Sequence, residues 1–143
     1  MSAPPSCGLR LTVALEVRAL AAAQRQLAAY LIAGGCAEDV RFRAELVVEE
    51  VVMNLIRHAR PLGATRAALL ALISDGRARL SVEDDGPAFD PLAALLRPLA
   101  SVVAGGHDGG FGLHLIRRHA DEACYARTGA ANRLELVFLP RLS

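Results

Sequence analysis

The residues best suited to chemistry form a polar stripe in an otherwise apolar segment, 46–58. Glu50, Asn54 and His58 recur every four residues, so a helix would stack them on one face. Asn is a poor residue inside a helix, and a buried carboxylate needs a partner or a metal ion. One interpretation is therefore a proton-accepting carboxylate beside a cation-binding amide. The alternative interpretation is a solvated helix face. Glu49, which lies about 100° around the helix from Glu50, suits that role. In this interpretation His58 is a packing residue.

A second cluster is an acidic turn at the end of a predicted strand. Every second residue of this strand faces the core, and Asp84 is the last of that row. Its carboxylate therefore needs a hydrogen-bond donor. The exocyclic amine of adenine is one such donor. Gly86 allows both a backbone turn and a close approach of a ligand. Asp-x-Gly alone is also an ordinary turn. Asp85 and Glu83 are predicted to be solvated.

A third cluster, Gly110-Phe111-Gly112-Leu113, opens a predicted helix. Unblocked backbone N–H groups and the positive end of the helix dipole at such a position favour phosphate. The alternative is a glycine-rich loop before an ordinary helix. The order of the three clusters suits a nucleotide, with a base at the acidic turn, phosphates at the glycines and an irregular segment, 97–109, that closes over it.

These clusters must be positioned by a small set of elements. Alternating apolar residues predict strands at 9–15, 66–73, 77–84, 123–127 and 133–139. Helical periodicity predicts helices at 17–32, from 38 to about 59, at 92–96, and from 110 or 111 to 121. A tight turn at 74–76 joins two strands, and a loop through Gly129 and Asn132 joins the last two. Mostly antiparallel strands with clustered helices predict an α+β two-layer sandwich.

Composition limits the function. The chain has 143 residues, is 53% hydrophobic and carries a net charge of +1, which predicts one soluble domain, 1–143, and gives no reason to expect a nucleic-acid or membrane partner. All 16 cationic residues are Arg, which excludes a phosphate-loop lysine and a Schiff-base lysine. Cys7, Cys36 and Cys124 are predicted to be reduced and structural. Without a secretory signal or a membrane span, the protein is predicted to be cytoplasmic.

Together the three clusters resemble the N, G1 and G2 boxes of the Bergerat-fold (GHKL) ATPases. They are most similar to the small bacterial anti-sigma factor serine kinases of partner-switching systems. Three runs carry the resemblance, which covers about residues 9–140: Asn-Leu-Ile-Arg-His-Ala at 54–59, Gly-Pro-Ala-Phe-Asp-Pro at 86–91 and Gly-Phe-Gly-Leu-His-Leu-Ile-Arg at 110–117. The resemblance implies a mixed, mostly antiparallel sheet with helices packed on one face.

The resemblance also implies roles for individual residues. Asn54 would coordinate the Mg²⁺ that bridges the phosphates of ATP, and Glu50 would be the general base. Asp84 would bind the adenine amino group, and Gly86 would admit adenine or a bridging water. The segment 97–109 would be a lid over the nucleotide. The remaining cofactor-binding positions implied by the family are His58, Ala88, Gly110, Phe111, Gly112 and Leu113.

Some positions depart from the family pattern. Ala88 stands where a second glycine is common, which predicts a tighter adenine pocket. The lid has His107-Asp108 where relatives often have a basic residue for the γ-phosphate, so Arg97 or His107 would have to substitute, or transfer would be slow. Arg133 follows Asn132 where many relatives have a Thr near the adenine.

The leading hypothesis is a protein serine kinase and anti-sigma factor. It would phosphorylate a STAS-domain anti-anti-sigma protein, sequester a sigma factor, and act as a homodimer through the edge strand at 9–15. The alternative is a non-catalytic anti-sigma or interaction protein with a degenerate or structural ATP site. The catalytic piece of a histidine kinase is disfavoured because no helix pair with a phospho-acceptor His precedes residue 9. A chaperone or topoisomerase module is disfavoured because no transducer domain follows.

Overall fold

The computed structural model describes residues 8–94 and 110–141. The described strands are β1 (Leu9–Ala14), β2 (Arg66–Ser74), β3 (Arg77–Asp84), β4 (Glu122–Thr128) and β5 (Ala131–Phe138). The described helices and helical turns are α1 (Val17–Ala33), α2 (Glu38–Asn54), the π-helical turn η1 (Leu55–Ala59), the 3-10 turn η2 (Arg60–Leu62), α3 (Pro91–Ala94) and α5 (Gly110–His119). The predicted lid and part of the predicted helix at 92–96 lie outside the described residues.

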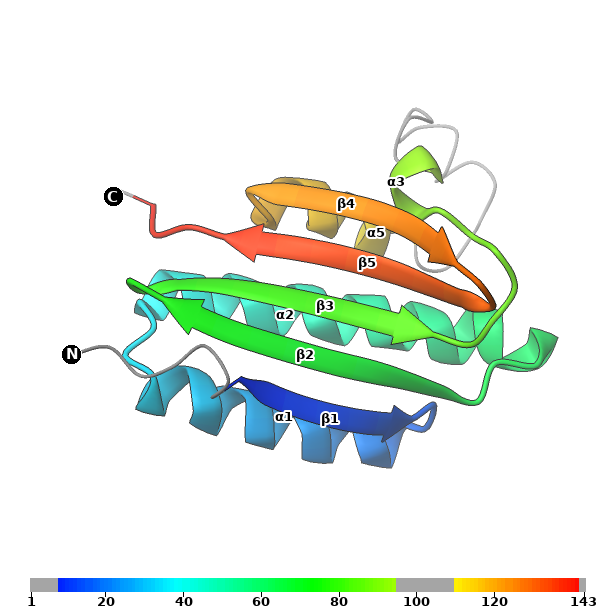
Figure 1. The fold of residues 1–143 in the computed structure, drawn as a ribbon, viewed down its shortest axis with the longest axis horizontal. Helices are drawn as coiled ribbons and strands as arrows, with labels where there is room; N and C mark the ends of the chain where they lie inside the picture. The colour runs from blue at the N-terminus through cyan, green and yellow to red at the C-terminus, as the bar shows by residue number, and fades with distance from the viewer. Residues whose placement is uncertain (1–7, 95–109, 142–143) are drawn as a thin grey trace.

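The five strands form one sheet in the order β1-β2-β3-β5-β4. Every pairing between them is antiparallel. Helices α1, α2 and α5 lie together behind the sheet, which gives the molecule two layers (Figure 1). The predicted two-layer α+β sandwich with helices on one face is confirmed. The predicted mixed sheet is antiparallel throughout the part of the chain that the structure describes.

The hairpin between β2 and β3 closes as the sequence predicts. Asp75 and Gly76 both have positive φ, 52° and 77°, the conformation of a type I′ turn. Its twist matches that of the flanking strands, so the turn sets the register that pairs Ser74 with Arg77. That register carries the core-facing row of β3 to its end at Asp84.

Helix α2 lies at the centre of the helical layer. It packs against α1 and α5 and against β3 and β5 of the sheet. Burying each of its valines contributes roughly 1.5–3 kcal/mol relative to exposure. Its outward side carries Phe42, whose residue is 65% exposed. The most completely buried core side chains are Leu27, Leu31, Val40, Val47, Leu80, Leu136 and Phe138.

Two differences from the predicted elements affect the site. The α-helical part of the second helix ends at Asn54, and the chain continues to Ala59 as a π-helical turn. Strand β5 begins at Ala131, so Asn132 lies in the strand and is buried rather than in the connecting loop. Asn usually indicates a turn because its side chain competes for backbone hydrogen bonds. Here the register pairs Asn132 with Asp84, whose carboxylate satisfies the amide.

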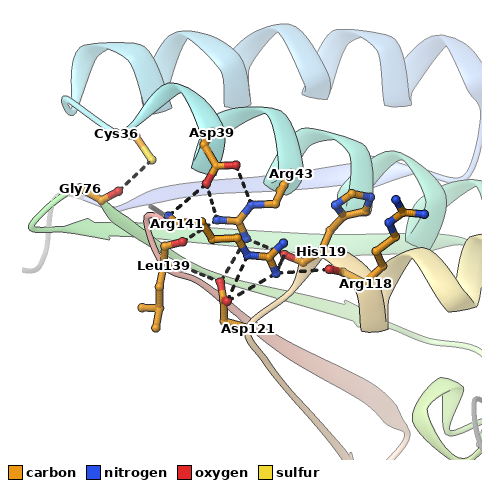
Figure 2. Close-up of polar contacts among 9 residues, drawn as sticks. All are labelled: Cys36, Asp39, Arg43, Gly76, Arg118, His119, Asp121, Leu139 and Arg141. Carbon is orange, nitrogen blue, oxygen red and sulfur yellow. Dashed lines mark hydrogen bonds and ion pairs between the residues drawn. The ribbon is translucent and has the colours of Figure 1, made fainter. Parts of the chain in front are cut away.

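A buried arginine ties the first turns of α2 to the end of α5 and the end of β5 (Figure 2). The Arg43 guanidinium donates to both carboxylate oxygens of Asp39, at 3.1 and 2.8 Å, and to Asp121 at 3.1 Å. It also donates to the carbonyl oxygens of His119, at 2.6 Å, and Leu139. All three guanidinium nitrogens are therefore engaged although the residue is only 2% exposed.

The charges of this network shift one another's pKa values. The hydrogen bond to Asp39, against a smaller opposing effect of burial, raises the pKa of Arg43. The same bond lowers the pKa of the Asp39 carboxyl. Burial opposes ionisation of Asp121, but its bonds from Leu139 N–H and Arg43 leave its pKa lowered. Burial and neighbouring arginines lower the pKa of His119. All four pKa shifts favour the protonation states of neutral pH, with Arg43 charged, Asp39 and Asp121 ionised and His119 neutral.

The cysteines divide into two environments. Cys36 is buried, its Sγ lies 3.6 Å from the carbonyl oxygen of Gly76, and burial raises its pKa (Figure 2). Cys124 is a free thiol on the exposed surface of β4. The structural role predicted for the cysteines therefore fits Cys36, whereas Cys124 makes no core contact. Cys7 lies outside the described residues. No helix among those described is long and apolar enough to cross a membrane.

Candidate functional site

The predicted site residues gather at one end of the molecule. The end of α2, the end of β3, the start of β5 and the start of α5 all lie at the same end of the two layers (Figure 1). Both chain termini lie toward the opposite end (Figure 1). Antiparallel pairing of β3 with β5 and the packing of α5 on α2 produce this arrangement. Residues from distant parts of the sequence thus share one surface.

The polar stripe on α2 separates into exposed and buried members. Glu49 is exposed, as expected for a solvated charge, whereas Glu50 is half-buried. Both side-chain amide atoms of Asn54, Oδ1 and Nδ2, are buried and have no hydrogen-bond partner among the residues that the structure describes. An unpartnered buried amide is costly, so such groups are rare unless a ligand completes them. The Glu50–Asn54 pair therefore has the properties of a binding site.

The helix changes its winding immediately after Asn54. The π-helical turn η1 spans Leu55–Ala59, and its wider turn interrupts the four-residue spacing that would stack His58 above Asn54. His58 is exposed. Turns of this kind occur often at functional sites because they reposition side chains within a helix. Ala59, the last residue of η1, packs near Gly86 of the acidic turn.

Asp84 ends β3 as a buried carboxylate, 9% exposed. Its Oδ1 accepts hydrogen bonds from the N–H of Gly86, at 2.9 Å, and from Nδ2 of Asn132, at 3.0 Å. A Cβ added to Gly86 would lie 3.0 Å from that same oxygen and 3.3 Å from Cβ of Ala59. A side chain here would crowd both the carboxylate and Ala59 of η1, so the close packing of the turn favours glycine.

The neighbouring Asp85 was predicted to be solvated, and the structure gives it partners. It is exposed, but it accepts hydrogen bonds from the N–H of Thr65 at 2.8 Å, from the Thr65 hydroxyl and from the N–H of Arg66 at 3.2 Å. The Thr65 side-chain bond is the main cause that lowers the pKa of Asp85 to about 2. Asp85 thus anchors the acidic turn to the start of β2.

Helix α5 begins at Gly110, as the sequence predicts, so Phe111, Gly112 and Leu113 lie in its first turn. The first N–H groups of a helix have no partner within it and point along the axis with the positive end of the dipole. This backbone arrangement suits an anion. The side chains of this first turn lie outside the described residues.

Ala88 lies in the exposed stretch between the acidic turn and α3. Asp90, two residues later, precedes α3 and caps its start, because its Oδ1 accepts from the N–H groups of Leu92 and Ala93 at 2.8 and 3.3 Å. Ala88 is therefore an exposed residue between the acidic turn and the capped start of α3. Arg97 and His107 lie outside the described residues.

Two residues that the sequence analysis did not assign to the site hold the acidic turn. Asn132 of β5 bonds to Asp84 and to the carbonyl oxygen of Pro87 at 2.8 Å, and Arg127 of β4 donates to the carbonyl oxygen of Gly86 at 2.8 Å. A polar residue in line with the core-facing row of Leu134, Leu136 and Phe138 is the signal that could have identified Asn132. Nothing in the sequence pattern identifies Arg127.

A separate groove lies on the outer side of the helical layer, between α1 and α2. Its volume is about 610 Å³, and it includes none of the predicted nucleotide-binding residues. Val17 and Phe42, at its border, are 61% and 65% exposed. The lining residues are Val17, Leu20, Ala21, Gln24, Phe42, Glu45, Leu46, Glu49 and Met53.

Comparison with known families identifies the family to which the chain belongs. Residues 13–138 match the histidine kinase-like ATPase domain. The chain belongs to this ATPase family. The resemblance to Bergerat-fold ATPases drawn from the three clusters is thereby confirmed, as is the α+β fold.

Individual proteins narrow the likeness. The chain is 35% identical over 99 residues to serine/threonine-protein kinase BtrW of Bordetella bronchiseptica, an alignment that covers 68% of this chain and 70% of BtrW. Its fold is similar to the RsbU and RsbW domains of Rv1364c from Mycobacterium tuberculosis, with a TM-score of 0.62 and 17% identity over 92% of this chain and 32% of that one. Histidine kinase AdeS of Acinetobacter baumannii also shares the fold, with a TM-score of 0.51 and 15% identity over 90% of this chain and 66% of that chain.

Proposed function

We propose that the protein is an ATP-dependent protein serine kinase and anti-sigma factor that acts in a partner-switching system. The observation that carries the proposal is the buried amide of Asn54, which lies one helical turn after the half-buried Glu50 and has no partner within the described structure. A helix that served the core alone would not keep such a group, because its desolvation is uncompensated. A bound ligand would compensate it.

The donor set fits Mg²⁺ that arrives with a nucleotide. Among the described residues there is no group of three or more His, Cys, Asp or Glu side chains that could hold a metal ion by itself. Magnesium is commonly bound by one or two protein oxygens together with substrate phosphates and waters. Oδ1 of Asn54 would be such an oxygen. When bound, the ion would neutralise charge on the phosphates during transfer.

The other residues take complementary roles in this proposal. Asp84 would accept the adenine amino group, and Gly86 would let the base or a water approach it. The first-turn N–H groups at Gly110 and Gly112 would bind phosphate oxygens. Glu50 would accept the proton of the attacking serine hydroxyl. His58, Ala88, Phe111 and Leu113 would complete the nucleotide pocket.

The proposed substrate is a serine of a STAS-domain anti-anti-sigma protein, and the proposed sequestered partner is a sigma factor. The family membership and the kinase name of the 35% identical relative support this assignment. The test incubates the purified protein with Mg-ATP and the STAS protein encoded nearest to it. Mass spectrometry should find one added phosphoryl group on a serine. An unmodified STAS protein under conditions where Mg-ATP binds would contradict the kinase assignment.

We propose a homodimer that uses the edge of the sheet. Among the described residues, strand β1 lies at one edge and pairs only with β2, so its other side can offer backbone groups to a second copy. Light scattering at micromolar concentration should give twice the chain mass. A monomer mass there would contradict the dimer.

A non-catalytic interaction protein is the second candidate. The groove between α1 and α2 favours it, because exposed Val17 and Phe42 border a surface that is independent of the nucleotide residues. In that case a partner would bind equally well after substitution of Asn54, and the wild-type protein would transfer no phosphate. Partner binding that requires Asn54 would contradict this candidate.

A further inference from the structure

A single buried amide organises the acidic turn. Asn132 is 6% exposed and lies opposite Asp84 in the β3–β5 register. Its Nδ2 donates to Oδ1 of Asp84 at 3.0 Å and to the carbonyl oxygen of Pro87 at 2.8 Å. The carbonyl oxygen of Gly86 lies 3.4 Å from the same nitrogen. One side-chain group thus contacts the carboxylate and two successive residues of the turn.

The orientation of this amide is set by its other atom. Oδ1 of Asn132 accepts hydrogen bonds from the N–H of Phe89, at 3.1 Å, and from the Tyr125 hydroxyl, at 2.6 Å. A backbone N–H can only donate, so the oxygen must face Phe89 and the nitrogen must face Asp84. A flipped amide would place its oxygen against the carboxylate and its nitrogen against a donor. The contacts therefore define both ends of the group.

The consequence falls on Asp84. Both hydrogen bonds that the described residues give to its carboxylate, from Gly86 N–H and from Asn132, end on Oδ1. A carboxylate held by one oxygen from two directions cannot rotate freely, so Oδ2 takes a defined position. A carboxylate oxygen accepts hydrogen bonds and cannot donate them, which suits an amine on a ligand.

We propose that Asn132 is a positioning residue for nucleobase recognition. It holds Asp84 with Oδ1 turned toward the protein and Oδ2 presented to the exocyclic amine of the base, so it determines the preference for an amino-purine without touching the base. The inference depends on the proposed function, in which Asp84 receives that amine. Arg127 supports the same turn through its 2.8 Å bond to the carbonyl oxygen of Gly86.

The test compares two ligands that differ only in the amine. Calorimetry measures the affinity of wild-type protein for Mg-ATP and for the magnesium complex of purine riboside triphosphate, which has hydrogen in place of the amino group. Wild-type protein should prefer ATP by roughly tenfold, the value of one hydrogen bond to a charged acceptor. Asn132→Asp replaces the donor with a carboxylate oxygen and repels Asp84. It should reduce the preference to about twofold or less, mainly through weaker ATP binding.

Arg133→Gln is the matched control. Arg133, the position at which many relatives have a Thr near the adenine, is the next residue along β5 and faces the other side of the sheet from Asn132. It pairs there with Glu83 at 3.3 Å and Glu135 at 2.9 Å. The control should keep the wild-type preference. An Asn132→Asp variant that folds and keeps the full preference would overturn the positioning role alone. Wild-type protein that binds neither ligand would overturn the proposed function and this inference with it.

A milder variant covers the case in which Asn132→Asp does not fold. Tyr125→Phe removes one of the two donors to Oδ1 of Asn132 and keeps the ring. It should lower the preference for ATP by roughly two- to threefold. The effect is small because the lost hydrogen bond is neutral and acts on Asn132 rather than on Asp84 or the base. An unchanged preference in Tyr125→Phe, with Asn132→Asp unfolded, would overturn the proposal.

Discussion

The two ends of helix α2 differ in whether their buried polar groups have hydrogen-bond partners. Near its start, Arg43 has partners for all three guanidinium nitrogens, from a carboxylate one turn back and from three positions late in the chain. At its last residue, Asn54 buries an amide whose two polar atoms have no partner within residues 8–94 and 110–141. Both ends of the helix pack in the same core. The contrast therefore reflects different roles, structural at the Arg43 end and ligand-binding at the Asn54 end.

The comparison separates stability from binding. A satisfied buried network fixes structure, because removing one member leaves the others unpaired. An unsatisfied buried group weakens the free protein and gains its partner only when a ligand arrives. Substitutions at the Arg43 end should therefore change the free energy of unfolding. Substitutions at the Asn54 end should change function and leave stability equal or higher.

The largest effect is expected for Glu50→Gln. Loss of a general base lowers the rate of phosphoryl transfer by about 10²–10⁴-fold, while the amide keeps the shape of the side chain and nucleotide affinity stays near the wild-type value. Radiolabel transfer to the STAS protein and calorimetry with Mg-ATP measure the two quantities. Glu49→Gln, on the exposed neighbour, is the control and should transfer at the wild-type rate. Equal rates for the two variants would exclude Glu50 as the base.

Arg43→Ala should cause the largest loss of stability. It leaves Asp39, Asp121 and the carbonyl oxygens of His119 and Leu139 without their common donor. The Asp39 and Asp121 side chains are 44% and 23% exposed, so water partly replaces the lost donor, and the expected cost is about 1–3 kcal/mol. Urea unfolding measures the change.

The control for Arg43 is Arg41→Ala. Arg41 pairs with exposed Glu38 at 3.9 Å, so its loss should cost less than about 1 kcal/mol. Similar costs for the two arginines would mean that the network in Figure 2 does not stabilise the fold.

Asn54→Leu should make the nucleotide-free protein more stable by about 1 kcal/mol, because it removes an unpartnered buried amide. It should also abolish the rise in melting temperature that Mg-ATP gives to wild-type protein. Asn132→Leu is the matched control with the opposite sign, since the amide of Asn132 is fully partnered and its loss should destabilise the protein. A lower stability for Asn54→Leu would contradict the contrast between the two ends.

A smaller effect is expected from pH. The pKa values of Asp39 and Asp121 are lowered, so their contribution is present above the ordinary carboxyl value of 3.8 and is lost as pH falls below it. The pKa of His119 is lowered from 6.5, so its contribution also appears above that value and is lost on acidification. Urea midpoints should therefore be level from pH 7 to 8 and decline toward pH 4. A midpoint that rises on acidification would contradict these shifts.

Asp85, in the acidic turn, should extend the decline in stability to lower pH. Its pKa of about 2 means that its bonds to the start of β2 persist until pH falls well below 3.8. Asp85→Asn should flatten the stability profile between pH 4 and 2, as urea midpoints can show.

Much of the fold could be predicted from local sequence patterns. Alternation along β3 placed Asp84 at the end of a buried row, and the Asp75-Gly76 pair predicted a tight hairpin, because both signals depend on neighbouring residues. The polar stripe on α2 identified Asn54 because an amide is unusual inside an apolar helix. These predictions needed no knowledge of distant contacts.

The remaining features depend on contacts between distant residues. Asn132 suits a turn by local preference, but pairing with Asp84, 48 residues earlier, places it in a strand. Nothing in the local sequence distinguishes Arg43 from other helix charges, because its acceptors come from the end of α5 and the residue after β5. The π-helical turn at Leu55–Ala59 has no distinctive sequence signal of its own.

The pairing of Asp84 with Asn132 also determines how freely the chain between them can change length. Strands β3 and β5 hold the two residues side by side, so the intervening segment is a closed loop with fixed ends. The entropy of closing a flexible loop grows only with the logarithm of its length, by about 0.6 kcal/mol for each doubling. A change in the length of the segment would therefore cost little through closure entropy alone. The β3–β5 register sets where the chain must return, whatever the length of the connection.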